Sequence, residues 1–212
     1  MKKLLIAALV LALLAAPALA KADIGAGQGG NESDQTELGE EPKQEQATNL
    51  TNLRKIISQR EQELNTTLKE VRESVRTVHE NQNKVVVAVH ALLSMENLTG
   101  GIGKNVSAIA RDFNNSVHST LNAEERIAER NAVITFLFGG DETAAAELLN
   151  QSAENNLRIR ELEQLRDECN CSDEVKAEYD SQIQALQQEQ DRLRTLAQDQ
   201  LQIKGIFGWL WK

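Results

Sequence analysis

Residues 64–93 read LNTTLKEVRESVRTVHENQNKVVVAVHALL, and this stretch decides the fold. Apolar side chains recur along it at alternating spacings of four and three residues, which is typical of a helix packed in a coiled coil or a bundle. The positions of this repeat are Leu64, Leu68, Val71, Val75, Val78, Gln82, Val85, Val89 and Leu92. Because Leu50, Leu53 and Ile57 precede the repeat with similar spacing, we expect one long helix over about residues 45–98.

A second helix is predicted over about residues 104–138. The glycines of Gly100-Gly-Ile-Gly103 break the first helix before it, and Gly139-Gly140 provides a stop after it. Its predicted inward face consists of Val106, Ile109, Phe113, Val117, Leu121, Ile127 and Ile134. This spacing is that of an amphipathic helix with one apolar face.

Third and fourth helices are predicted over about residues 141–168 and 172–203. Their matched lengths and short connection favour an antiparallel pair, with Ser172 as the N-cap of the last helix. No segment alternates in the manner of a strand. We therefore expect an all-α fold, an elongated antiparallel helical bundle or coiled coil over residues 48–204 with one long N-terminal helix and three shorter helices.

The N-terminal residues have the composition of a secretion signal. Lys2 and Lys3 precede an unbroken apolar run, and alanines at 18 and 20 form a small-x-small cleavage pattern, so residues 1–20 predict a signal peptide. An uncleaved anchor is the alternative. Residues 21–47 are rich in Gly, Glu, Gln and Asp with few large apolar side chains, which predicts a disordered acidic linker. We expect an exported protein, either extracellular or at the cell surface or envelope.

Eight Asn-x-Ser/Thr triplets without a central proline support the same location. Their acceptors are Asn31, Asn49, Asn65, Asn97, Asn105, Asn114, Asn150 and Asn170. On the predicted helices each acceptor falls on a flank, a far face, a helix end or the linker, so none is forced into the core. The triplets predict a glycoprotein, with incidental occurrence at exposed polar positions as the alternative.

Composition and motifs argue against several functions. The formal net charge is -9, and no cluster of Lys and Arg offers a surface for nucleic acid. The three histidines, His79, His90 and His118, lack ligand spacing; we expect His79 and His118 to be solvated and His90 to be packed in the bundle. There is no P-loop and no nucleophile elbow. We therefore predict a protein that is not an enzyme and has no catalytic, cofactor-binding or metal residues.

Cys169 and Cys171 are the only cysteines, at the corner between the last two predicted helices. A disulfide between them would close a small, strained ring. Intermolecular bridges, free thiols and a metal site with the neighbouring carboxylates are the alternatives, although two thiolates are half of a zinc site.

The C-terminal residues 205–212, Gly-Ile-Phe-Gly-Trp-Leu-Trp-Lys, contain both tryptophans of the chain. Aromatic and lysine side chains around a short apolar segment suit the interface between membrane and water. The predicted contact residues for a membrane surface or an envelope partner are Ile206, Phe207, Trp209, Leu210 and Trp211. Folding back onto the bundle is the alternative.

The long heptad stretch, Phe136-Leu-Phe-Gly-Gly-Asp141, the Cys-Asn-Cys corner and the Gly-Ile-Phe-Gly-Trp-Leu-Trp tail together resemble small exported helical proteins of methanogenic archaea, over about residues 80–212. This resemblance implies a cell-surface setting and transfers no functional residues. Two functions are therefore expected: a glycosylated structural or interaction protein of the envelope, or a peripheral membrane-binding or substrate-holding module that acts through its tail. The heptad stretch also predicts a possible homo-oligomer.

Overall fold

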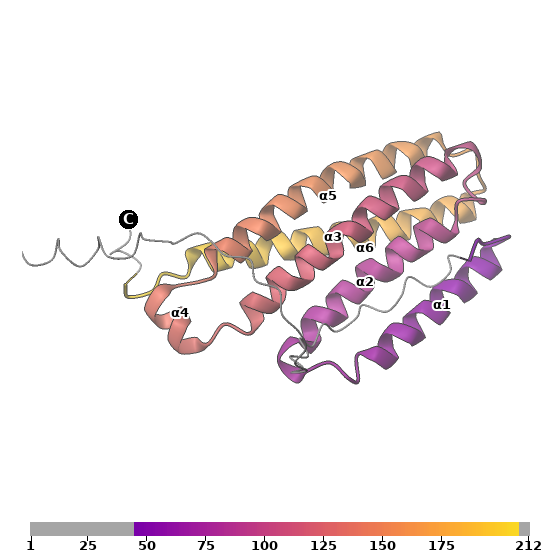
Figure 1. Ribbon diagram of the computed structural model, residues 1–212. Helices are drawn as coiled ribbons and strands as arrows, with labels where there is room; N and C mark the ends of the chain where they lie inside the picture. Colours follow the sequence, from indigo (N-terminus) through magenta and orange to yellow (C-terminus); the bar gives the residue numbers. More distant parts are fainter. Residues whose placement is uncertain (1–44, 208–212) are drawn as a thin grey trace, which may run out of the picture. The chain divides into compact units, whose positions relative to one another are not determined.

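The computed structural model describes residues 45–207, and this range is all-helical, with no β-strand (Figure 1). Within it the α-helices are α1 (Leu50–Thr67), α2 (Arg76–Ser94), α3 (Gly103–Ala128), α4 (Ala132–Phe138), α5 (Glu142–Glu168) and α6 (Asp173–Gln202). The predicted all-α class is confirmed. The predicted signal peptide, most of the predicted linker with Asn31, and the tail residues Trp209, Leu210 and Trp211 lie outside the described residues.

Helices α2, α3, α5 and α6 pack side by side in a bundle-like arrangement. Each contacts two of the others, in the order α2, α3, α5, α6 and back to α2, while α1 packs on α2 (Figure 1). Large apolar side chains such as Leu92, Phe113, Tyr179 and Leu186 fill the space between them and are fully buried. A smaller cluster around Leu148 and Leu193 continues the core towards the beginning of α5.

The predicted single long helix is wrong, because the chain turns back at residues 68–75. Helix α1 ends at Thr67, and after a short 3-10 helix, Glu73–Val75, α2 begins at Arg76. The hydroxyls of Thr66 and Thr67 donate to the Gln62 and Leu64 carbonyl oxygens at 2.9 and 2.8 Å, and such side-chain bonds compete with continuation of a helix. The apolar repeat persists through the turn because both α1 and α2 place one face against the core.

The predicted second helix is also two helices. Helix α3 ends at Ala128, and Asn131 starts α4 by accepting a hydrogen bond from the Val133 backbone N–H at 2.8 Å. This cap redirects the chain, so Ile134, predicted to face inward, is 44% exposed. The other six predicted inward residues of this stretch are buried or half-buried.

The end of the predicted linker belongs to the helical domain. Ala47 is fully buried, and its backbone N–H donates to the Ser94 carbonyl oxygen at 2.8 Å. The Gln46 side-chain amide donates to the Leu93 carbonyl oxygen at 3.1 Å. These contacts satisfy carbonyls at the C-terminal end of α2, so the ordered domain begins before residue 48.

Helices α5 and α6 form the predicted hairpin. The Asp141 carboxylate accepts from the Ala144 backbone N–H at 2.9 Å, and the Ser172 hydroxyl accepts from the Val175 backbone N–H at 3.4 Å. Both residues were expected at these helix starts, because short polar side chains satisfy the free N–H groups of a first turn.

Candidate functional site

The most unusual surface of the described residues is an apolar one at α4. This helix has the sequence Ala-Val-Ile-Thr-Phe-Leu-Phe and contains no fully buried side chain. Val133 and Phe136 are 61% and 65% exposed. A short helix with such a sequence would ordinarily be part of a core, so its exposure calls for a partner.

The C-terminal segment adds to the same surface. The backbone N–H groups of Ile206 and Phe207 donate to the Phe136 and Leu137 carbonyl oxygens at 3.0 and 2.9 Å. These bonds satisfy carbonyls that the last turn of α4 cannot pair within the helix. The Phe138 and Phe207 rings lie with their centroids 6.3 Å apart. Residues 205–207, here called the C-terminal segment, are thereby fixed onto α4.

Two glycines make this close approach possible. Gly139, with a φ of 90°, ends α4 in a conformation that other residues rarely adopt. Gly205 lies against the backbone of Phe138 and Gly139, where any β-carbon would collide. The Arg130 guanidinium also holds the bend, since its Nε donates to the Gly139 carbonyl oxygen at 3.0 Å.

We call the resulting patch the apolar end surface. It consists of Val133, Ile134, Phe136, Phe138, Ile203, Ile206 and Phe207, all exposed. The predicted contact residues Ile206 and Phe207 lie in it, whereas Trp209, Leu210 and Trp211 follow it in the sequence outside the described residues. The α4 residues were missed by sequence reasoning because an apolar stretch that ends a predicted amphipathic helix looks like core.

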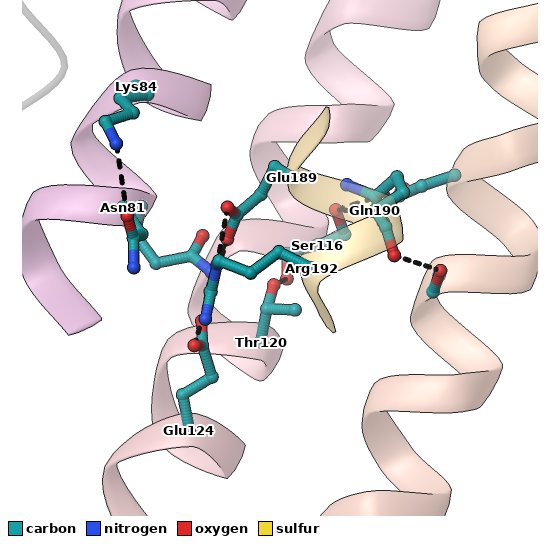
Figure 2. Close-up of polar contacts among 11 residues, drawn as sticks. Asn81, Lys84, Ser116, Thr120, Glu124, Glu189, Gln190 and Arg192 are labelled. Atoms are coloured by element: carbon teal, nitrogen blue, oxygen red, sulfur yellow. Dashed lines mark hydrogen bonds and ion pairs between the residues drawn. The ribbon is translucent and has the colours of Figure 1, made fainter. Parts of the chain in front are cut away.

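A second feature is a charged cluster buried between α2, α3 and α6 (Figure 2). The Glu124 side chain is fully buried, and the Arg192 guanidinium binds both its carboxylate and that of Glu189. The Gln82 side-chain amide donates to Glu124 Oε1 at 2.6 Å and to Glu189 Oε1 at 3.3 Å. When both carboxylates are ionised, the single guanidinium leaves this cluster with one negative charge. Burial raises the pKa of Glu124, and Arg192 opposes that shift.

We infer that the cluster helps to align the helices. Buried charges of this kind contribute little net stability compared with apolar side chains, and in some proteins they specify which helices pair and in which register. A cleft of about 710 Å³ between α1, α2 and α6 reaches Glu189 and Arg192, which explains why Arg192 is only partly buried. Gln82 was visible in the apolar repeat, and Glu124 continues the spacing of Phe113, Val117 and Leu121, so a polar residue at a core position was the available signal.

A neighbouring polar group lies between α3, α5 and α6. The Asn155 side-chain amide donates to the Ser116 hydroxyl at 3.1 Å and to Gln190 Oε1 at 3.3 Å, and all three side chains are buried. Arg158 donates to Asn155 Oδ1 at 2.6 Å. Because these groups satisfy one another, they specify the pairing of helices in the same way.

The histidines have different surroundings. His79, predicted to be solvated, is partly buried, and its Nε2 lies 2.7 Å from Glu125 Oε1, so that prediction is wrong. His118 is exposed, as expected. His90 is half-buried, and burial together with nearby Arg60 lowers its pKa. Within residues 45–207, no three His, Cys, Asp or Glu side chains come together in a way that would hold a metal ion.

The acceptor triplets divide into two groups. Six of the seven acceptor asparagines in the described range are exposed, and Asn114 is half-buried. In the accessible triplets, those of Asn49, Asn65 and Asn170, the Ser or Thr is exposed too. In the covered triplets, those of Asn97, Asn105, Asn114 and Asn150, the Ser or Thr is buried. A transferase that reads this hydroxyl would have to act on the covered triplets before folding.

Cys169 and Cys171 are joined by a disulfide in the corner between α5 and α6. Cys169 is 3% exposed, whereas Cys171 is partly exposed. This corner lies at the opposite end of α5 from α4 (Figure 1).

No helix among residues 45–207 combines the length and apolar composition needed to cross a bilayer. No protein-family model matches the chain, and neither a curated protein nor a solved structure is significantly similar to it.

Proposed function

We propose that the protein is a non-enzymatic, exported and N-glycosylated helical protein that associates with the interface between membrane and water through its apolar end surface. The observation that carries this proposal is the joining of α4 and the C-terminal segment by two backbone hydrogen bonds into one exposed apolar patch. Soluble monomers rarely expose contiguous apolar patches of this kind unless they bind something.

The sequence beyond the patch favours lipid as the occupant. Phe207 is followed by Gly-Trp-Leu-Trp-Lys, and Lys204 precedes the segment. Trp and Lys are the side chains that settle at the headgroup level, where the indole ring meets both the hydrocarbon and water. The patch is short, so it predicts association with the surface and not a span.

The expected affinity is weak and depends on apolar contact. Burying a whole Phe side chain contributes about 1.5–3 kcal/mol of free energy. Burying the exposed part of Phe136 or Phe138 in the membrane interface would therefore contribute about 1–2 kcal/mol of binding free energy. The net charge of -9 opposes binding to anionic lipids. Binding should therefore persist on zwitterionic vesicles and at high salt, where a basic protein would be released.

Vesicle flotation with a matched control tests the proposal. Replacing Phe136 and Phe138 by Ser should weaken flotation with phosphatidylcholine vesicles more than tenfold, because about 2 kcal/mol or more of apolar contact is lost. Leu157→Ser is the control, since Leu157 is 57% exposed on α5 and lies outside the apolar end surface. Equal flotation of both variants would refute the proposal. If light scattering shows a dimer and the Phe substitutions convert it to a monomer, a second copy of the chain covers the patch instead of lipid.

Export and glycosylation rest on the predicted signal peptide and on the exposed acceptors. Mass spectrometry of the native protein should find glycans on at least the accessible triplets and an N-terminus after residue 20. Unmodified asparagines at all eight triplets would remove this part of the proposal.

A coiled-coil homo-oligomer has less support. The apolar face that would pair two long helices is used inside the chain, where α1 packs on α2 and α2 on α3 and α6. We therefore place the functional contact at the apolar end surface and not along the helices.

A further inference from the structure

The corner between α5 and α6 contains a disulfide that does little to hold the fold. Cys169 and Cys171 are two residues apart in sequence. The stabilisation by a disulfide grows with the logarithm of the number of residues in the loop that it closes, so a loop this short contributes little. The hairpin around it is already fixed by the packing of α5 on α6 and by the Ser172 cap. A disulfide that stabilises a fold usually joins segments distant in sequence, and this one does not. We therefore looked for a chemical role for the bond.

The surroundings of the two sulfurs differ in a way that suits a reversible reaction. Cys169 Sγ is buried and lies 3.6 Å from the Thr99 carbonyl oxygen, the distance of an S–H···O hydrogen bond. Only the reduced thiol has the proton for this bond, so the site is already complementary to reduced Cys169. Cys171 is partly exposed between Asn170 and Ser172, which are both exposed. In a chain without a glycan on Asn170, Cys171 is therefore the cysteine of the pair that an external thiolate can approach, since Cys169 is buried.

The position of Cys171 also favours exchange. It directly precedes the N-cap of α6, where the positive end of the helix dipole favours a nearby thiolate, while the Ser172 hydroxyl already accepts a hydrogen bond from the Val175 N–H. Four exposed carboxylates flank the corner, those of Asp167, Glu168, Asp173 and Glu174, of which Asp167 is paired with Arg166. Their negative field attracts cationic substrates and repels anionic ones.

We propose that Cys169–Cys171 is a thiol–disulfide exchange site that oxidises paired cysteine thiols in basic segments of other exported proteins. A substrate thiolate attacks Cys171 Sγ and forms a mixed disulfide, while the bond to Cys169 breaks and Cys169 leaves as a thiolate. Cys169 takes up a proton and donates it to the Thr99 carbonyl oxygen. The second substrate thiolate then attacks the substrate sulfur of the mixed disulfide and releases Cys171. The substrate loses two electrons and two protons and gains a disulfide, and the chain gains two thiols.

Equilibration with glutathione tests the redox character of the pair. The full chain is held in mixtures of reduced and oxidised glutathione, quenched by acid, and scored for free thiols by mass spectrometry after alkylation. The pair should be half reduced within the range of mixtures found in secretory compartments, and circular dichroism should show the fold unchanged. A pair that stays oxidised in reduced glutathione alone, or a fold that is lost on reduction, would make it a structural staple and overturn the proposal.

Single substitutions test the assigned roles. Cys169→Ser leaves Cys171 as a single thiol, and Cys171→Ser leaves buried Cys169 as a single thiol. Iodoacetamide should modify Cys171 at least tenfold faster than Cys169. Only the first variant should form a mixed disulfide with oxidised glutathione, in which the Cys171 thiolate attacks one sulfur and one reduced glutathione leaves. In the unchanged chain, a reduced dithiol peptide flanked by Lys should be oxidised several-fold faster than one flanked by Glu, with the difference lost at high salt. Equal reactivity of the two cysteines, or equal rates for the two peptides at low salt, would contradict the mechanism.

Discussion

Replacement of Arg192 by Leu is the perturbation that tests the buried charged cluster most severely. The guanidinium binds Glu124 and also Glu189, with its Nε 2.8 Å from Glu189 Oε2. Without it, two carboxylates with side chains 0% and 6% exposed would share only the Gln82 amide. Leu approximates the lost volume near the apolar part of the side chain, so the change acts mainly on charge.

The expected loss is large on the scale of a single domain. Removing one partner from a buried ion pair costs about 3–5 kcal/mol, against a total stability of about 5–15 kcal/mol. Glu124→Gln is the matched control, because it removes the excess negative charge and leaves the pair of Arg192 and Glu189 intact. We expect the free energy of unfolding of this control to differ from that of the unchanged chain by no more than about 1 kcal/mol.

The effect should also depend on pH. Burial raises the pKa of Glu124 above its ordinary value of 4.5. The stability that this group contributes is therefore fully present below its unfolded pKa and is lost as pH rises through its folded pKa. Acidification from neutral pH towards pH 5 should relieve the uncompensated charge in Arg192→Leu and narrow its difference from the unchanged chain.

Urea unfolding followed by circular dichroism measures these differences. With a slope of about 2 kcal/mol per molar urea, the Arg192→Leu midpoint at pH 7 should fall by about 2 M. A loss below about 1 kcal/mol, or a difference that widens on acidification, would refute the reasoning.

Three further predictions concern single features of the described structure. Transferase added to the folded chain should modify only the accessible triplets, and the covered triplets should react only when the chain is unfolded, as mass spectrometry would show. Modification of the folded chain at covered triplets would contradict this prediction. Gly205→Ala should detach the C-terminal segment from α4 and speed hydrogen exchange at the Phe207 amide, whereas Gly101→Ala, where a β-carbon meets nothing within 4 Å, should leave it unchanged. Tyr179→Phe should be neutral or stabilising by up to about 1 kcal/mol in urea unfolding, because the buried hydroxyl has no hydrogen-bond partner; a clear loss would reveal one.

The helical class and most helix boundaries followed from apolar spacing and caps. Asp141 and Ser172 start α5 and α6 where their side chains predicted, because capping is a local interaction that the sequence displays directly. The turn at residues 68–75 was not predictable in this way. It contains no Gly or Pro, and spacing alone does not distinguish one long helix from two that fold against the same core.

Only the C-terminal half of the candidate site was predicted from the sequence, and the α4 half was not. The tail was recognised by its composition, whereas the α4 half depends on the change of direction at Asn131 and on contacts between residues 70 apart in sequence, such as Phe136 and Ile206. Local sequence does not show which apolar residues the tertiary packing will leave exposed.

Quenching of tryptophan fluorescence by brominated lipids tests the central claim most directly. Trp209 and Trp211 are the only tryptophans, so all tryptophan emission comes from the residues that follow Phe207 in the sequence. On vesicles of brominated phosphatidylcholine we predict a blue shift and strong quenching, both reduced when Phe136 and Phe138 are replaced by Ser and both retained in Leu157→Ser. Emission that stays unshifted and unquenched with vesicles in excess would contradict the account.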